Sequence, residues 1–363
     1  MSNRVAISRC KSYHLDEVTE SIREVISNTS FPCVKNKKVL VKPNILSDAK
    51  TETGITTNPI VVEALINILK EEGAETIYLG DSPGLHSSSF DAHTCGIKDV
   101  CERTGTNWVD FTANPVMHKI GKHSLPIARI IDEVDVVISV AKFKTNQLMY
   151  STGCVKNMFG SIPGLNKSSC HVKAPSRSAF ADLITEIYKE SKCSYGLMDG
   201  IIAMEGPGPA NGNIRQVGLI LGSADSYLTD YAQAMIMGYR IEDIPILMAG
   251  KKKGYTKLEP TYPLLDAREL VIKDYKRVEI GKEKAIPALI KSNLLKPFHS
   301  LMIKIRKTPT FRDDKCVLCK RCVDICPAKA LDVVDNHITL NKAHCVRCYC
   351  CHEMCPKNAI DII

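Results

Sequence analysis

Two stretches near the end of the chain, CVLCKRCVDICP at 316–327 and CVRCYCCHEMCP at 345–356, share one cysteine spacing. Each has three cysteines separated by two residues, and a fourth that follows three residues later and precedes a proline. When Cys316 is laid on Cys345 the two stretches align, and residues 330–333 then fall on 359–362. A repeat with a fixed period indicates two copies of one unit that share a core. We therefore expect a small module of cysteine loops, short helical turns and short strands.

The cysteine spacing favours an iron–sulfur cluster over zinc. A 4Fe–4S cube needs four thiolates, and three cysteines at i, i+3 and i+6 on a tight loop reach three corners of one cube. Paired CxxC motifs also make zinc sites, which take four ligands per ion. Zinc has no use for a third cysteine at this spacing or for a Cys-Pro, so the run predicts iron–sulfur ligation.

The complete run resembles the bacterial two-cluster ferredoxins, in which the fourth cysteine of each motif ligates the other cluster. This resemblance implies two 4Fe–4S clusters. The implied ligands are Cys316, Cys319, Cys322 and Cys355 for one cluster, and Cys345, Cys348, Cys351 and Cys326 for the other. Cys350 is out of register with the repeat, so we do not expect it to be a ligand.

The remaining composition is that of a globular protein in a reducing compartment. With 363 residues, 44% of them hydrophobic, the chain can form one large domain and a small one. Seven of the 16 cysteines lie outside the module without ligand spacing, which is typical of buried free thiols. The first ten residues have no apolar signal segment, and no run approaches the ~18 apolar residues of a membrane span. We therefore expect a cytoplasmic protein.

The net charge of +8 is modest for this length. A nucleic-acid-binding protein would show a basic stripe with interleaved aromatic residues, and this chain has one tryptophan and no such stripe. The charge instead favours attraction of small anions or of an acidic redox partner protein.

Residues 1–250 alternate between strand-like and helix-like segments. Strands are expected at 39–41, 76–79, 108–111, 136–140, 195–198 and 217–221, and helices at 57–73, 97–103, 176–191 and 226–237. This alternation predicts an α/β domain with an open, mainly parallel sheet and helices on both faces. We expect this domain over 1–250, a connecting segment over 251–308, and a small α+β two-cluster ferredoxin-like module over 309–363.

Residues 285–307 of the connecting segment form an amphipathic and basic stretch. Such a stretch could lie on a membrane surface, or it could pack the small module onto the large domain. Pro297 interrupts it, so we favour packing and do not expect membrane association.

Polar residues follow four of the expected strands. Because ligands bind at the carboxyl ends of parallel strands, these residues predict a pocket there. A glycine-rich stretch at 152–164 adds the polar residues Lys156 and Asn157, and Lys167 and His171 follow it. This stretch could approach an anion with its backbone N–H groups. It matches neither a Walker A loop nor a dinucleotide fingerprint. The candidates for substrate binding are Lys42, Asn44, Lys142, Lys144, Lys156 and Asn157, and the candidate proton donors are Asp81, Asp199 and Glu205.

These stretches, at 42–44, 80–84, 142–146, 152–164 and 199–209, resemble the domain-of-unknown-function 362 family. Members of that family often carry a C-terminal pair of 4Fe–4S motifs, as this chain does. The resemblance covers essentially the whole chain and implies an iron–sulfur protein, but it implies no reaction.

Three functions fit these features. The first is an oxidoreductase that passes single electrons to a small anionic substrate held by the α/β domain, with protons from the carboxylates. The second is an electron carrier or adaptor whose α/β domain docks a partner enzyme, and the third is a scaffold that delivers clusters. Polar groups gathered at one sheet edge favour the first. The alternative for the lysines is a network of lysine–carboxylate pairs that ties loops together.

Overall fold

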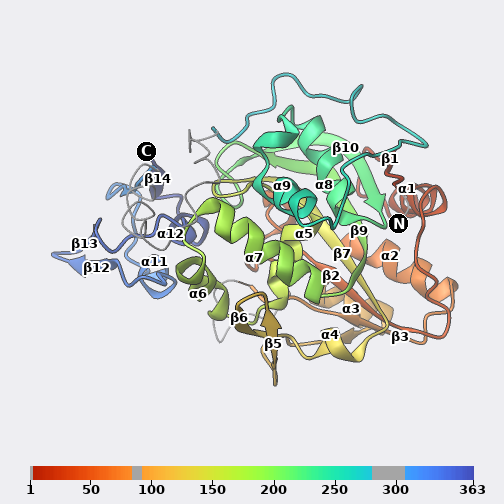
Figure 1. The fold of residues 1–363 in the computed structure, drawn as a ribbon, viewed down its shortest axis with the longest axis horizontal. Helices are drawn as coiled ribbons and strands as arrows, with labels where there is room; N and C mark the ends of the chain where they lie inside the picture. The colour runs from red at the N-terminus through yellow and green to blue at the C-terminus, as the bar shows by residue number, and fades with distance from the viewer. Residues whose placement is uncertain (1–2, 84–91, 280–306) are drawn as a thin grey trace.

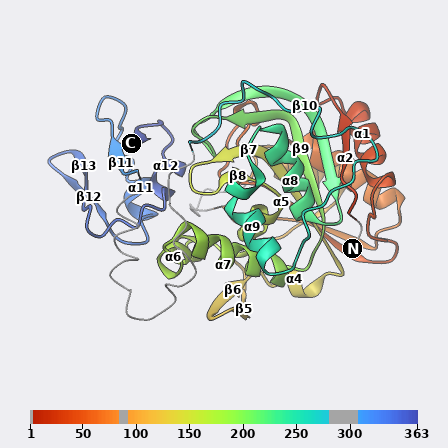
Figure 2. The ribbon, with the colours of Figure 1, turned by 45° about the horizontal axis from the view of Figure 1, so that its top comes forward.

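The computed structural model describes residues 3–83, 92–279 and 307–363. An α/β unit built on one large sheet makes up most of the molecule, and a small module of short strands and helices lies against it (Figure 1). The N-terminus and the module lie on opposite sides of the sheet-centred unit in both ribbon views (Figure 2).

The central sheet has eight strands in the order β1-β10-β9-β7-β2-β3-β4, with β8 paired to β7. The strands from β9 to β4 run parallel, whereas β1, β10 and β8 pair antiparallel with their neighbours. This confirms the mainly parallel sheet. The strand bounds are β1 (Ala6–Arg9), β2 (Lys38–Pro43), β3 (Thr76–Leu79), β4 (Asn107–Trp108), β7 (Val136–Asn146), β8 (Tyr150–Thr152), β9 (Cys193–Glu205) and β10 (Asn213–Ser223).

Helices cover both faces of this sheet, so a hydrophobic core lies on each side. Val39 and Val41 of β2 belong to one core and Leu40 to the other, as the alternation of side chains along a strand requires. All residues of β7 are buried, which is usual for a central strand of a parallel sheet. One core is covered by α1 (Leu15–Ser27), α2 (Pro59–Glu71) and α3 (Ile97–Thr104), and the other by α4 (Ile130–Glu133), α5 (Cys154–Asn157), α6 (Asn166–Lys173), α7 (Arg177–Glu190), α8 (Ser226–Ile236) and α9 (Pro245–Lys252).

The start of α2 shows how a polar loop leaves the sheet edge. Asn58, rather than Thr57, caps the helix, because its side chain accepts a hydrogen bond from the Ile60 amide at 2.9 Å. Thr57 instead donates to the carbonyl of Val140 and accepts from the amide of Asn44. These bonds fix the loop after β2 against β7. The remaining short elements here are the hairpin of β5 (Val116–Ile120) and β6 (His123–Ile127) and the single turns η1 (Thr51–Thr53), η2 (Met158–Ser161) and η3 (Ile241–Asp243).

The described part of the expected connecting segment packs along the α/β unit. Leu258, Ala267 and Tyr275 are buried in its core, and the Tyr275 hydroxyl donates to the carbonyl of Met204 at 2.9 Å. Of the amphipathic stretch 285–307, residues 285–306 lie outside the described residues, as does Gly84 of the loop after β3. Among the helices that the structure describes, none has the length and apolar character needed to cross a membrane.

The small module repeats its own backbone. Its strands are β11 (Pro309–Phe311), paired with β14 (Ile360–Ile362), and β12 (Leu331–Val334), paired with β13 (His337–Leu340). Its helices, α11 (Arg321–Asp324) and α12 (Cys350–Glu353), occupy equivalent places in the two copies of the repeat. The left-handed residues also recur at equivalent places, at Leu318 and Arg347, Lys320 and Tyr349, and Lys329 and Asn358. The repeat seen in the sequence is therefore a repeat of conformation.

Candidate functional site

The eight predicted cluster ligands line two separate hollows in the small module. One hollow is lined by Cys316, Cys319, Cys322 and Cys355, and we name this set the outer cysteine site. The second is lined by Cys326, Cys345, Cys348 and Cys351, which we name the inner cysteine site. The fold thus brings the fourth cysteine of each motif to the first three of the other.

The residues around both hollows suit a 4Fe–4S cluster. Each presents four cysteines among mostly apolar residues, and no His, Asp or Glu lines either hollow in the described part of the chain. The amides of Ala330 and Ala359 donate to the sulfurs of Cys326 and Cys355, at 3.2 and 3.3 Å. Hydrogen bonds to ligand sulfurs are one of the means by which a protein sets a cluster potential.

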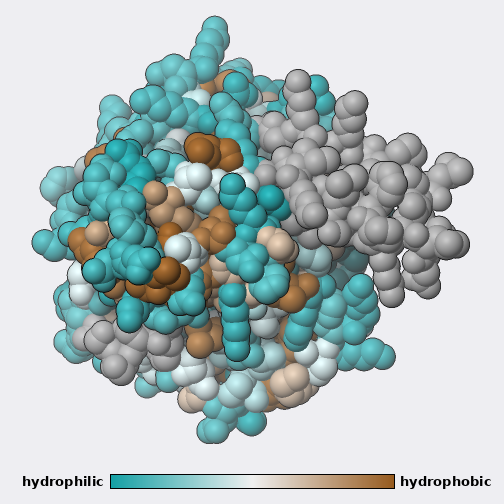
Figure 3. Space-filling model, turned by 90° about the vertical axis from the view of Figure 1, so that its left-hand side faces the viewer, coloured by the Kyte–Doolittle hydropathy of each residue, from teal (hydrophilic) through white to brown (hydrophobic). Residues whose placement is uncertain are grey.

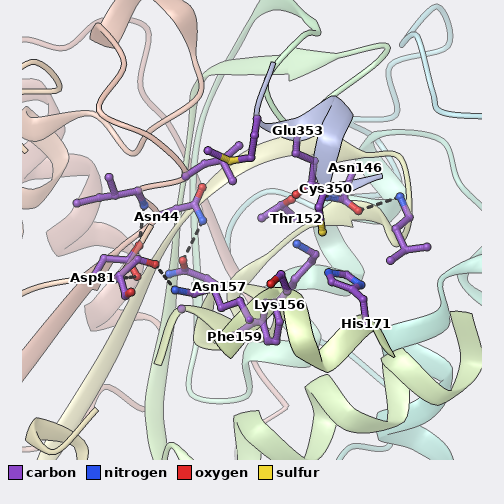
Figure 4. Close-up of a pocket in the computed structure, with 18 of the residues that line it drawn as sticks. Asn44, Asp81, Asn146, Thr152, Lys156, Asn157, Phe159, His171, Cys350 and Glu353 are labelled. Carbon is purple, nitrogen blue, oxygen red and sulfur yellow. Dashed lines mark hydrogen bonds between the residues drawn. The ribbon is translucent and has the colours of Figure 1, made fainter. Parts of the chain in front are cut away.

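A pocket lies where the carboxyl ends of the sheet meet the small module (Figure 4). We name it the interface pocket. Four residues of the module form one wall, namely Ile325, Cys350, Glu353 and Met354. The α/β unit contributes most of the rest, including Asn44, Asp81, Asn146, Thr152, Lys156, Asn157, Phe159, Lys167, Ser168, His171 and Phe180.

The inner cysteine site borders this pocket. Cys350 lines both the pocket and the hollow of the inner site, and Ile325 of the pocket wall precedes Cys326 of the inner set. Lys156 reaches toward Cys350 from the opposite wall in Figure 4. The inner cysteine site and the interface pocket therefore share Cys350 as a common wall residue.

Helix α12 is fixed to the α/β unit by polar contacts. The Asn146 amide at the end of β7 donates to Glu353 at 3.0 Å. Asn211 donates to the carbonyl of His352 at 2.9 Å, and the His352 ring lies 3.2 Å from the carbonyl oxygen of Pro207. These contacts hold the wall that carries Cys350 in place.

Lys42, a predicted substrate-binding residue, is instead paired inside the protein. Its Nζ lies 2.7 Å from Asp81 Oδ1, and both side chains are buried. Burial lowers the pKa of Lys42, and the Asp81 carboxylate opposes that shift. Asp81 also accepts hydrogen bonds from the amides of Ile45 and Ser82, so the pair ties the loops after β2 and β3 together.

Gly160 makes room for this ion pair. A Cβ at that position would lie 2.3 Å from Asp81 Oδ1 and 2.5 Å from Lys42 Nζ. The glycine-rich stretch thus lets the backbone approach two buried charges, rather than only an external anion.

Lys142 and Asp199 form a second buried ion pair, with 2.7 Å between Nζ and Oδ2. Tyr13 donates to Asp199, and so does the amide of Asn58. Glu205 pairs with Arg215 at 3.2 Å. Neither Asp199 nor Glu205 lines the interface pocket, so Asp81 is the one member of the predicted proton-donor set that the fold places there.

Lys144 and Lys167 are buried without a carboxylate partner in the described part of the chain. Burial, helped by the charge of Lys156, lowers the pKa of Lys144 to about 7, and its Nζ donates to the carbonyl of Ile55. Burial likewise lowers the pKa of Lys167 to about 7, and its Nζ donates to the carbonyls of Ser82 and Pro83. Of these two lysines, Lys167 lines the interface pocket and Lys144 does not.

Lys156 is the half-buried ammonium of the pocket that has no hydrogen-bond or ion-pair partner among the described residues. Two buried oxygens of the lining, Thr152 Oγ1 and Asn44 Oδ1, also have no partner there. Buried polar groups normally find partners, so groups left open beside a free cation indicate a ligand site. The three groups come from the loop after β2, the end of strand β8 and helix α5.

The orientation of the Asn44 amide follows from its neighbours. Asn157 donates to the Lys42 carbonyl and to Ser139 Oγ, so its Oδ1 must face Lys42 Nζ and Asn44 Nδ2. Asn44 Nδ2 is therefore committed to Asn157, and its Oδ1 is left as an acceptor. The pocket therefore presents one cation, the Lys156 ammonium, and one hydrogen-bond acceptor, Asn44 Oδ1.

Several lining residues were not predicted as site residues from the sequence. Ile325, Glu353 and Met354 belong to the cysteine module and reach the pocket only because the module docks at the sheet edge. Thr152 and His171 lie within or just after the glycine-rich stretch, which was the available signal for them.

Two family matches account for most of the chain. Residues 39–235 match the family described as a domain of unknown function (DUF362), and residues 308–356 match a 4Fe-4S dicluster domain. The chain is 29% identical over 287 residues to a thylakoid-associated protein of Synechocystis sp., which covers 77% of this chain and 89% of that one.

Among solved structures, a Thermotoga maritima protein is similar with a TM-score of 0.33 and 12% identity, over 53% of this chain. The chain spans about half the length of that protein, 51%, and the similarity is too low to bear on fold or function. The match over residues 39–235 covers more than half of the 363 residues. The chain therefore belongs to the DUF362 family and carries a C-terminal 4Fe-4S dicluster ferredoxin domain.

Proposed function

We propose that this iron–sulfur protein is an oxidoreductase that exchanges single electrons with a small anionic substrate in the interface pocket. The observation that carries the proposal is the position of Cys350, which lines both the pocket and the inner cysteine site. A carrier that only docked a partner enzyme would need no pocket with an unpaired lysine beside its cysteines, so this arrangement favours the oxidoreductase over the carrier or adaptor.

Two bound 4Fe–4S clusters, one in each cysteine site, would supply single electrons. The ligands would be the two sets of four that line the hollows, with Cys350 left as a thiol. The proposed division of the chain keeps the bounds 1–250, 251–308 and 309–363. A cytoplasmic location remains part of the proposal, since none of the sixteen cysteines forms a disulfide in the structure.

Lys156 would bind the anionic group of the substrate. Asn44 Oδ1 would accept a hydrogen bond from a separate donor group of the same substrate. Phe159, Phe180 and Met354 line the same pocket and exclude water. Charge–charge attraction is stronger where water is excluded, so one free lysine there can select a carboxylate or a phosphate. The substrate class we propose is therefore a small carboxylate or phosphate that also carries a hydrogen-bond donor.

Lys167 is the group best placed to deliver a proton. The arrival of an electron at an organic molecule usually demands a proton, and a donor works best with a pKa near the operating pH. Lys167 lines the pocket and has a pKa of about 7. Asp81 accepts three hydrogen-bond or ion-pair contacts from Lys42, Ile45 and Ser82, which leaves it less available.

Thermal stability in the presence of anions tests the pocket. Anaerobically purified protein should melt at a higher temperature in phosphate or acetate than in chloride at equal ionic strength, because a ligand that binds the folded state stabilises it. Lys156→Ala should lose this gain and keep its melting temperature in chloride. Lys251→Ala, at an exposed lysine of α9, should keep the gain. No anion effect in the wild type would reject the pocket.

A further inference from the structure

The two halves of the cysteine module have the same backbone but different surroundings. In α12, Cys350, Cys351 and His352 are buried, whereas in α11 only Cys322 is buried. Arg321 is exposed at the position of the first copy that corresponds to Cys350 in the second. One half of the module is therefore docked, and the matching part of the other half is open to solvent.

Two positions that line the outer cysteine site carry basic residues, whereas the equivalent positions at the inner site carry uncharged ones. Lys320 and Lys357 line the outer hollow. Tyr349 and Ala328 occupy the corresponding places in the inner hollow, which no charged residue of the described chain lines. At these two equivalent positions, the outer site has lysines and the inner site has uncharged residues.

The outer site also opens to solvent. Cys319 is exposed, and Val317 beside it keeps 56% of its surface accessible. We name the surface formed by Val317, Cys319, Lys320 and Lys357 the outer face. Figure 3 shows the side of the molecule that carries the module, where hydrophobic patches lie among mostly hydrophilic residues.

The charge near the outer face is not cancelled by neighbouring acids. Asp313 and Asp314 are paired with His337 and Arg312, each at 3.1 Å. Within residues 312–324 and 355–361, which carry the cysteines of the outer site, four exposed basic residues have no ion-pair partner among the described residues, against one such acid, Asp324. These basic residues are Lys315, Lys320, Arg321 and Lys357. The exposed acids Asp332 and Asp335 of the β12–β13 hairpin have no ion-pair partner among the described residues either.

We propose that the outer face binds an acidic one-electron carrier protein. One electron would pass per encounter between the redox centre of the carrier and a cluster in the outer site, with no bond made or broken and no proton required. A small apolar centre within a basic rim suits the small, short-lived interfaces of electron-transfer proteins. Complementary charge mainly accelerates association, and salt weakens it.

An anionic membrane could also attract a basic face, but the position of Cys319 favours the protein carrier. The exposed ligand lies within the patch, so a bound carrier would approach the outer site closely. A lipid surface gains nothing from this placement. The inference rests on the iron–sulfur role of the module and not on the anion pocket, so either can fail without the other.

The test compares two charge-reversed proteins with intact clusters. Lys320→Glu with Lys357→Glu changes the outer face, and Lys251→Glu with Lys252→Glu makes the same charge change at exposed residues of α9. The measurements are the Kd for a small acidic ferredoxin by calorimetry, and the rate at which that reduced ferredoxin reduces the protein in stopped flow. Iron content serves as the check on the clusters.

We expect the outer-face variant to bind the ferredoxin at least about tenfold more weakly at low salt, with unchanged iron content. The α9 variant should behave as the wild type does. Lys320→Gln with Lys357→Gln should give an intermediate loss. Equal binding by both charge-reversed proteins would overturn the proposal. So would wild-type binding to phosphatidylglycerol vesicles with none to the ferredoxin.

Discussion

Asn146, the last residue of β7, donates a hydrogen bond to Glu353 of α12, with 3.0 Å between Nδ2 and Oε1. The two residues are 207 positions apart in the sequence. Both line the interface pocket, so this bond joins the sheet edge to the helix that carries Cys350. The contact between the α/β unit and the cysteine module is therefore part of the pocket wall.

Replacing this donor should loosen the docked module. Asn146→Asp keeps the oxygen that accepts from the amides of Leu148 and Met149 but places a carboxylate against Glu353. Loss of a hydrogen bond to a charged group and the new repulsion should together cost about 1.5–3 kcal/mol of docking free energy. Faster amide hydrogen exchange in α12 would report this loss. Asn336→Asp, at an exposed turn of the module, should leave that exchange unchanged.

The cluster ligands can be tested by iron content. Anaerobically purified protein should contain about eight irons per chain, as two 4Fe–4S clusters require. Cys348→Ser should lose iron from the inner site, and Cys350→Ser should keep the wild-type content. Similar iron loss in the two variants would show that the assignment of Cys348 and Cys350 is wrong.

Lys167 should make the folding stability depend on pH. Its pKa in the folded protein is about 7, below the ~10.4 of an unfolded lysine, so the unfolded chain binds an extra proton between these values. The free energy of unfolding should therefore rise as the pH increases through that window. The melting temperature of the wild type should therefore rise between pH 7 and pH 9, and Lys167→Met should remove the contribution of Lys167 to that rise.

The control for Lys167→Met is Lys173→Met, at an exposed lysine of the same helix, α6. That variant should follow the wild-type pH dependence. If Lys167→Met also followed it, the lowered pKa of Lys167 would be refuted.

Gly160 should not tolerate a methyl group. In Gly160→Ala the new Cβ would collide with Lys42 Nζ and Asp81 Oδ1 and separate the buried pair. Breaking a buried ion pair typically costs about 3–5 kcal/mol, which should appear as a large drop in melting temperature. Gly254→Ala meets nothing within 4 Å and has a φ of +72°, so it should cost only about 1–2 kcal/mol. Equal losses in both variants would contradict the close approach at Gly160.

The sheet and the cysteine module were predictable because their signals are local. Apolar runs such as 136–140 indicate buried strands, and the recurrence of one cysteine spacing indicates a repeated loop. The direction of the strands at one edge was not predictable. Apolar alternation does not say that β10 turns back beside β9, or that β1 then adds next to β10.

The pocket could be predicted only in part, because its chemistry depends on register and docking. Lys42, Lys142, Lys144 and Lys156 look alike in the sequence. Strand register places Asp199 against Lys142, and the loop after β3 places Asp81 against Lys42, so these two are paired. Lys156 is left open, and α12 supplies the other wall. No local pattern contains that information.

The most direct test of the central claim is the electron paramagnetic resonance spectrum of the reduced protein with and without phosphate. If an anion binds at Lys156 beside the inner site, phosphate should change the signal of one cluster and leave the other unchanged. The change should be absent in Lys156→Ala, and the responsive signal should be missing in Cys348→Ser. A spectrum that does not respond to phosphate, or two signals that respond alike in the wild type and Lys156→Ala, would contradict the account.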